Sequence, residues 1–191
     1  MKRALILIFL PLISLAARSQ EDPEMVTRLE KLMKATQALD VSTILDYTYP
    51  KLFTLVPRET MVGIMEQSFD SDELSVSLDS VAVQKVFPIF SIAEGKYSKV
   101  LHTMVMRMKM KSEGSDTEVA QMMNVLAEKY GKENVRYEPK VNTVVIFRLA
   151  VIVAVKDEFS KDWTFINYME EEPLAEMLFS KELINKLREF K

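Results

Sequence analysis

The longest apolar stretch after the N-terminal segment predicts a central β-strand. Residues 144–155 read VVIFRLAVIVAV, a stretch of β-branched, aromatic and small residues bounded by turn residues. A strand this apolar has to be covered on both faces for most of its length. Arg148 interrupts it and could hold a ligand carboxylate. We expect Arg148 instead on an outer sheet face, beside Ile146, Ile152 and Ala154, where this apolar surface would suit contact with a second copy.

Five further segments have strand patterns. They are residues 74–79, 86–92, 97–111, 134–137 and 163–169. In the third segment, alternation of period two places its one histidine and its four methionines on one face. That face carries Val100, His102, Met104, Met106, Met108 and Met110. We expect it to point at the core, because the other face ends in basic residues.

Apolar stripes at helical spacing and capping residues predict the helices. Asp22 begins a first helix, Ser115 and Glu118 form a capping box for an inserted helix, and Ser180 begins the last one. The order is helices, strands, an inserted helix, strands and a terminal helix. This order predicts an α+β fold, with a curved, mainly antiparallel sheet packed by the N-terminal helices, an inserted helix and a C-terminal helix.

The N-terminus has the pattern of a secretory signal peptide over residues 1–19. Lys2 and Arg3 precede an apolar stretch over residues 4–15, and small residues lead to Ser19. The stretch is shorter than the ~20 residues that a membrane span needs. We therefore expect export, with a single α+β domain over residues 20–191 located in the periplasm or outside the cell. An uncleaved N-terminal anchor is the alternative.

Composition narrows the classes of function. The chain has no cysteine, which excludes disulfides, thiol nucleophiles and cysteine metal sites. Without Lys2, Arg3 and Arg18 it has 22 basic and 28 acidic residues, a net charge of −6. No basic cluster with interleaved aromatic residues occurs, so we expect no nucleic-acid partner. No motif for a cofactor or a later membrane span appears, and we expect neither.

The helical segment 38–69, ALDVSTILDYTYPKLFTLVPRETMVGIMEQSF, leads into long strands, and DWTFINYM at 162–169 forms a late strand. In this pattern the chain resembles a secreted bacterial member of the nuclear transport factor 2-like superfamily, which has a cone-shaped, cystatin-like α+β fold. The resemblance implies a pocket inside the cone. The superfamily includes isomerases, dehydratases and binding modules, so fold does not give function. An inserted helix at 115–131 and a terminal helix depart from the pattern and could close the mouth of the cone.

His102 is the only histidine and the first candidate for chemistry. The family resemblance implies that it could act as a general base beside Asp46, Tyr47 or Tyr49 in a lyase or isomerase. The alternative is a partly buried histidine bonded to the backbone, which we prefer because spacing fixes no second acid or base. The candidate pocket residues are His102, Tyr47, Tyr49, Met104 and Met106.

The methionines next to His102 also suggest a soft-metal site for Cu(I). Methionine, however, fills irregular apolar gaps well, and residues two apart on a strand lie about 6.5–7 Å apart. We therefore expect no metal and no catalytic residue. The sequence favours an exported, non-catalytic binding or interaction protein, with a small apolar ligand and a homodimer through the sheet face as its partners. The alternatives are a lyase or isomerase using a pocket around His102, and a periplasmic Cu(I)-binding protein.

Overall fold

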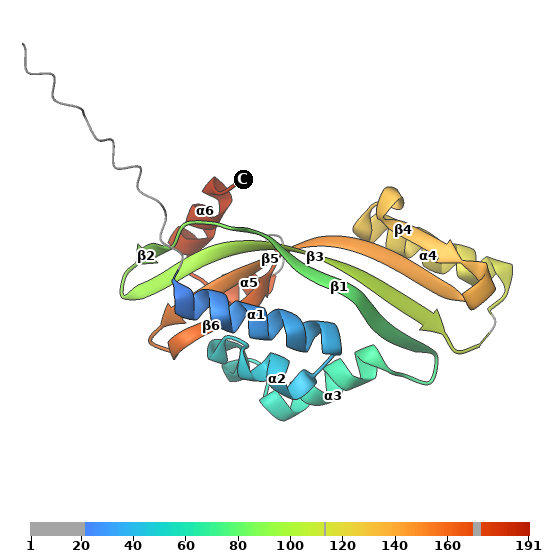
Figure 1. The fold of residues 1–191 in the computed structure, drawn as a ribbon, viewed down its shortest axis with the longest axis horizontal. Coiled ribbons are helices and arrows are strands. Elements are labelled where there is room, and N and C mark those ends of the chain that lie inside the picture. Colours follow the sequence, from blue (N-terminus) through green and yellow to red (C-terminus); the bar gives the residue numbers. More distant parts are fainter. Residues whose placement is uncertain (1–21, 113, 170–172) are drawn as a thin grey trace, which may run out of the picture.

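The apolar stretch predicted as a central strand lies inside an antiparallel sheet (Figure 1). The computed structural model describes residues 22–112, 114–169 and 173–191. Within these ranges the sheet has six strands in the order β1-β3-β5-β4, with β2 paired to β3 and β6 paired to β5. The strands are β1 (Leu74–Val86), β2 (Phe90–Ile92), β3 (Gly95–Met110), β4 (Val135–Glu138), β5 (Thr143–Asp157) and β6 (Ser160–Tyr168).

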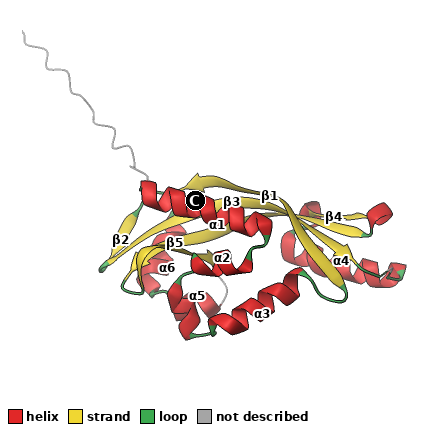
Figure 2. Cartoon of the chain, turned by 60° about the horizontal axis from the view of Figure 1, so that its bottom comes forward, coloured by secondary structure: helices red, strands yellow, loops and turns green. Residues whose placement is uncertain are grey.

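Helices cover both faces of this sheet, so the fold is α+β as predicted (Figures 1 and 2). The helices are α1 (Pro23–Ala38), α2 (Val41–Asp46), α3 (Arg58–Phe69), α4 (Asp116–Tyr130), α5 (Pro173–Leu178) and α6 (Lys181–Glu189). Three predicted caps are present. The side chains of Asp22, Ser115 and Ser180 accept hydrogen bonds from backbone amides in the first turns of α1, α4 and α6.

Alternate residues of β5 belong to two separate cores. Ile152 and Ala154 pack in one cluster with residues of α1, on what we call the inner face of the sheet. Val153 and Val155 pack in the other cluster with residues of α5 and α6, on the outer face. Burial on both faces explains why this half of the strand has no polar alternation.

The expected outer position of Arg148 is wrong. The even-numbered neighbours that we placed with it on an exposed face are all buried: Ile146, Ile152 and Ala154. The outer face is instead the odd-numbered one, where α5 and α6 do not reach Phe147 and Leu149. These two side chains are 46% and 59% exposed. Both faces of the strand are apolar, so alternation alone could not distinguish them.

The segment after α3 forms one long strand rather than two. β1 runs through residues 74–86, and only the short β2 follows Pro88. The register of β1 against β3 shifts between Leu78 and Ser80 and again between Val83 and Lys85. Each bulge moves the alternation by one residue, which makes a continuous strand look interrupted in the sequence.

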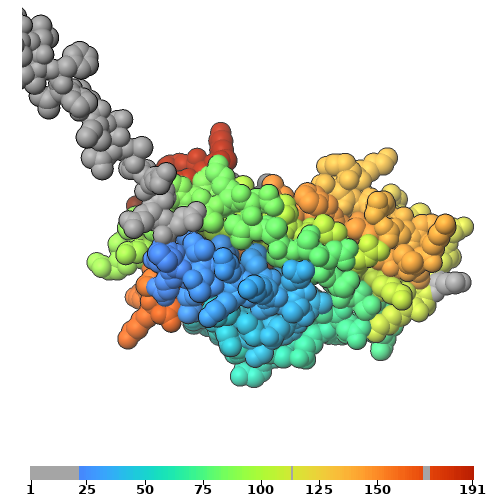
Figure 3. All heavy atoms as spheres, in the orientation of Figure 1, coloured from blue at the N-terminus to red at the C-terminus, as the bar shows by residue number. Residues whose placement is uncertain are grey.

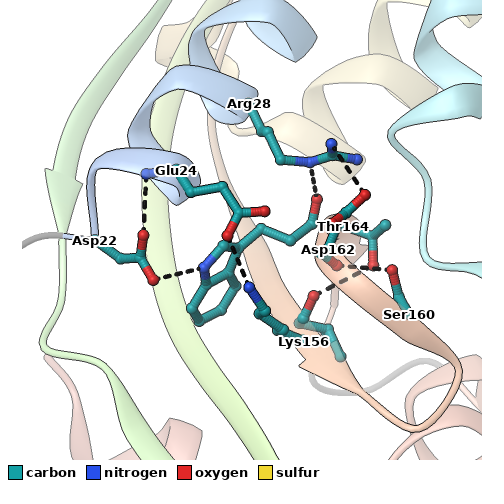
Figure 4. Close-up of polar contacts among 9 residues, drawn as sticks. Asp22, Glu24, Arg28, Lys156, Ser160, Asp162 and Thr164 are labelled. Atoms are coloured by element: carbon teal, nitrogen blue, oxygen red, sulfur yellow. Dashed lines mark hydrogen bonds and ion pairs between the residues drawn. The ribbon is translucent and has the colours of Figure 1, made fainter.

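Polar contacts fix α1 to the β5–β6 hairpin (Figure 4). The carboxylate of Asp22 accepts from the Glu24 amide and from the indole N–H of Trp163, each at 2.9 Å. The bond from Trp163 is the main reason that the pKa of Asp22 lies below its usual value. Arg28 Nε donates to the Trp163 carbonyl at 2.6 Å, and Lys156 pairs with Glu24 at 2.7 Å. The first helix is thereby held at a fixed place on the inner face.

The predicted signal peptide at 1–19 lies outside the described residues. Among the helices that the structure describes, none has both the length and the apolar character needed to cross a membrane.

In the space-filling view, α1, α2 and α3 (blue to teal) lie side by side next to β1 (green) (Figure 3). These helices form the wall that faces the inner side of the sheet across the site described next.

Candidate functional site

A cavity of about 400 Å³ lies between helices α1–α3 and the inner face of the sheet. Strands β1, β3, β5 and β6 supply its floor, and Leu174 of α5 lies at its border. Its size is within the range of small-molecule sites in proteins. Neither α4 nor α6 contributes a residue to the described lining. The N-terminal helices and the curved sheet therefore form most of the cavity.

Most of the cavity wall is apolar and unusually rich in methionine. Of the 22 described lining residues, 17 are apolar, and six of these are methionines. The methionines are Met33, Met61, Met65, Met104, Met106 and Met169. Methionine side chains are unbranched and polarizable, so they adapt to ligands of different shape. Such a wall favours an apolar ligand over a rigid polar one.

Five polar residues complete the lining. They are Thr36, Thr48, His102, Arg148 and Asn167. In the sheet register His102 faces Ala150, and Met104 faces Arg148. His102 and Arg148 are thus diagonal neighbours on adjacent strands, a spacing that a long side chain can bridge. They meet because β3 and β5 pair in this register, which neither segment reveals alone.

His102 is buried in a neutral state. The residue is only 1% exposed, and its ring nitrogen Nδ1 has no hydrogen-bond partner among the described residues. Burial, followed by the positive charge of Arg148, lowers the pKa of His102 to about 4. A buried polar atom without a partner costs about 1–3 kcal/mol. We expected a partly buried histidine bonded to the backbone; the structure has a fully buried one whose Nδ1 has no such bond among the described residues.

Among the described residues, Arg148 has no negatively charged partner at the cavity. Its Nη2 donates to the thioether sulfur of Met169 at 3.6 Å, and its guanidinium carbon lies 6.0 Å from the centre of the Tyr130 ring. Neither neighbour carries a negative charge, and thioether sulfur is a weak acceptor. No carboxylate among the described residues lies within ion-pair distance of it. Four other arginines do have such partners: Arg28, Arg58, Arg107 and Arg136.

Three of the five sequence-predicted pocket residues line the cavity: His102, Met104 and Met106. Tyr47 and Tyr49 are not among its described lining residues. Tyr49 is buried in the apolar cluster with α5 and α6, and its hydroxyl donates to Asp157 at 2.6 Å. Burial, then this bond, raises the pKa of Tyr49. The ring of Tyr47 lies against Arg28, 5.0 Å from the guanidinium carbon.

The general-base hypothesis needs a second acid or base, and the structure places the candidates elsewhere. Asp46 forms an ion pair with Arg58 at 2.6 Å on the surface. Among the described lining residues, none is Asp, Glu, Lys or Tyr. The described residues likewise contain no group of three or more His, Asp or Glu side chains that could hold a metal ion.

Sequence reasoning did not include Asn167, Met169 or the methionines of α3 in the pocket. Arg148 was singled out because a charged residue inside an apolar strand is unusual, although its face was assigned wrongly. Comparison with models of known protein families, with characterised proteins and with solved structures finds no match for this chain.

Proposed function

We propose that this protein is an exported, non-catalytic binding protein that holds a small, mostly apolar molecule in the cavity beside His102. The observation that carries the proposal is a cavity of about 400 Å³ whose wall is apolar at 17 of 22 residues. Concave apolar sites with a few converging polar groups are the usual form of small-molecule sites. The resemblance to the nuclear transport factor 2-like superfamily supports it, because helices packed inside a curved sheet are the arrangement that resemblance implies.

Binding is favoured over catalysis because His102 lies among apolar side chains and Arg148. General acid–base chemistry on a carbon acid needs a proton donor or acceptor within hydrogen-bond reach of the substrate. A neutral histidine with a pKa of about 4 is a weak base at neutral pH. A neutral, weakly basic imidazole suits a residue that contacts a ligand without exchanging a proton with it.

Uptake of a neutral fluorescent dye tests the binding function. Purified protein lacking residues 1–19 is titrated with 1-aminoanthracene, whose emission rises in an apolar site. Leu78→Trp places a bulky ring at a half-buried lining residue of β1 and is expected to reduce uptake strongly. Leu149→Trp makes the same change at an exposed residue of the outer face and is expected to leave uptake unchanged.

Equal dye binding by the two variants would show that the dye does not enter the cavity. No saturable uptake by the unsubstituted protein, together with no co-purifying ligand in native mass spectrometry, would contradict the proposed function.

Export belongs to the same proposal. It rests on the basic, apolar and small-residue order of residues 1–19. N-terminal sequencing of the protein recovered from its host is expected to begin at or near Gln20. Recovery of protein that still carries residues 5–15 would contradict cleavage.

We also propose that the outer face of the sheet forms a homodimer. The support is the pair of exposed apolar side chains, Phe147 and Leu149. They lie between the segment of β5 that pairs with β4 and the segment that pairs with β6. A two-fold axis through this patch would place the same residues of two copies against each other. This contact leaves the cavity open, because the cavity lies on the opposite face.

A further inference from the structure

The described lining of the cavity carries one charged side chain and none of opposite charge. Arg148 is the only charged side chain among the described residues that line it. No carboxylate in the described part of the chain lies within ion-pair distance of its guanidinium group. A half-buried cation without a counter-charge raises the local potential and attracts an anion.

Arg148 lies at an exposed part of a mostly apolar lining. Arg148 contacts Met169, which is exposed, and Asn167 beside them is also exposed. The wall formed by α1 and α2 includes the buried apolar residues Leu32, Met33 and Leu45, as well as the half-buried Thr36 and Ile44. A ligand that fits this gradient has a charged group near Arg148 and an apolar body that reaches toward α1.

A single arginine suits a monoanion better than a dianion. A carboxylate presents two oxygens that match the paired N–H groups of one guanidinium. A phosphate dianion would keep one charge uncompensated next to apolar side chains, which is costly. The neutral His102 beside Arg148 adds hydrogen-bonding capacity without a second positive charge.

We infer that the ligand is an amphiphilic carboxylic acid whose carboxylate binds Arg148 next to His102 and whose apolar body fills the rest of the methionine-rich cavity. This inference rests on the proposed binding function and specifies the chemical class of its ligand. The carboxylate would accept from the guanidinium and would lie within reach of the imidazole, whose Nδ1 has no hydrogen-bond partner among the described residues.

Calorimetric titration with three ten-carbon probes tests the inference. Decanoate, decanol and decylamine share one apolar chain and differ in the charge of the head group. At neutral pH and low salt, decanoate is expected to bind about tenfold or more tightly than decanol, since a charge-assisted pair adds to the same apolar contacts. Decylamine is expected to bind most weakly, because Arg148 repels it.

Substitution identifies the residue responsible. Arg148→Met keeps an unbranched apolar side chain and removes the charge, so it is expected to weaken decanoate binding about tenfold and to change decanol binding by less than about twofold. Arg148→Lys is expected to restore part of the preference for decanoate. Arg136→Met is the matched control, because Arg136 is an exposed arginine of β4 outside the cavity.

The only histidine of the chain provides a second readout that needs no variant. Its imidazole nitrogen resonances are expected to shift on addition of decanoate. Decanol bound as tightly as decanoate would overturn the inference and leave the proposed function standing. Equal weakening of both probes by Arg148→Met would also overturn the inference alone. If none of the three probes binds and the neutral dye is also excluded, both the inference and the proposed function are overturned.

Discussion

The charge of His102 depends strongly on the fold. An exposed histidine titrates near pH 6.5, whereas burial and then Arg148 lower the pKa of His102 to about 4. Between these two pH values the unfolded chain binds a proton that the folded protein does not. The free energy of unfolding therefore falls as the pH is lowered through this interval. The stabilisation that the neutral, buried His102 loses on acidification is fully present above about pH 6.5. It amounts to roughly 3 kcal/mol of the free energy of unfolding at most.

A comparison with His102→Gln isolates this contribution. Between pH 7 and about pH 4.5 the unsubstituted protein is expected to lose about 2 kcal/mol more stability than the variant, measured by urea unfolding at both pH values. The carboxylates titrate in both proteins and cancel in the difference. Parallel pH dependences would show that the imidazole is not buried in its neutral form.

Single-residue prediction succeeded where one strand face had a distinct polarity. In β3 the basic end of one face predicts that His102, Met104 and Met106 point inward. They do, but Met104 and Met106 are half-buried and line the cavity instead of the core. β5 offers no such contrast, so Arg148 was placed on the wrong side. The methionines of α3 gave a helical stripe, but only the packing of α3 over β1 decides that this stripe meets a cavity.

At the scale of elements, the helix starts were readable because capping is local. Asp22, Ser115 and Ser180 each satisfy amides within three residues of themselves. The length of β1 was not readable, since its two bulges are set by pairing with β3 and appear in the sequence only as broken alternation.

The Asp22 cap has a second role that can be measured. Asp22→Ala removes the α1 cap and also leaves the buried indole N–H of Trp163 without its acceptor. We expect a loss of about 2–3 kcal/mol in the free energy of unfolding. Asp40→Ala removes a cap of the same kind from α2, where the second donor is only the exposed hydroxyl of Thr43, and is expected to cost about 1 kcal/mol.

Thermal or urea unfolding of both variants gives the comparison. Equal losses would mean that the indole bond adds nothing, and that α1 is held to the hairpin mainly by its apolar contacts and its other polar links.

At the scale of the whole molecule, the two sheet faces are used differently. The inner face carries the cavity under α1–α3, and the outer face is covered by α5 and α6 only along one half of β5. The uncovered part presents Phe147 and Leu149. A sequence cannot show where a short terminal helix stops covering a sheet, and so the residues of the proposed dimer contact had to come from the structure.

The dimer is tested by charge at this patch. Leu149→Glu is expected to shift the protein from dimer to monomer in sedimentation analysis, because a two-fold contact would bring two like charges together. Val125→Glu is the control, since Val125 is 64% exposed and belongs to α4, whose Tyr130 contacts Arg148 on the inner face. A monomeric unsubstituted protein at high concentration would contradict the proposal.

The six methionines of the cavity also make it a target for oxidants. Oxidation turns a thioether into a polar, chiral sulfoxide, which is poorly suited to an apolar wall. Mild peroxide treatment is therefore expected to abolish dye uptake while the fold persists, and methionine sulfoxide reductase is expected to restore it. The composition that makes the cavity adaptable would then couple its ligand affinity to the oxidation state of its surroundings.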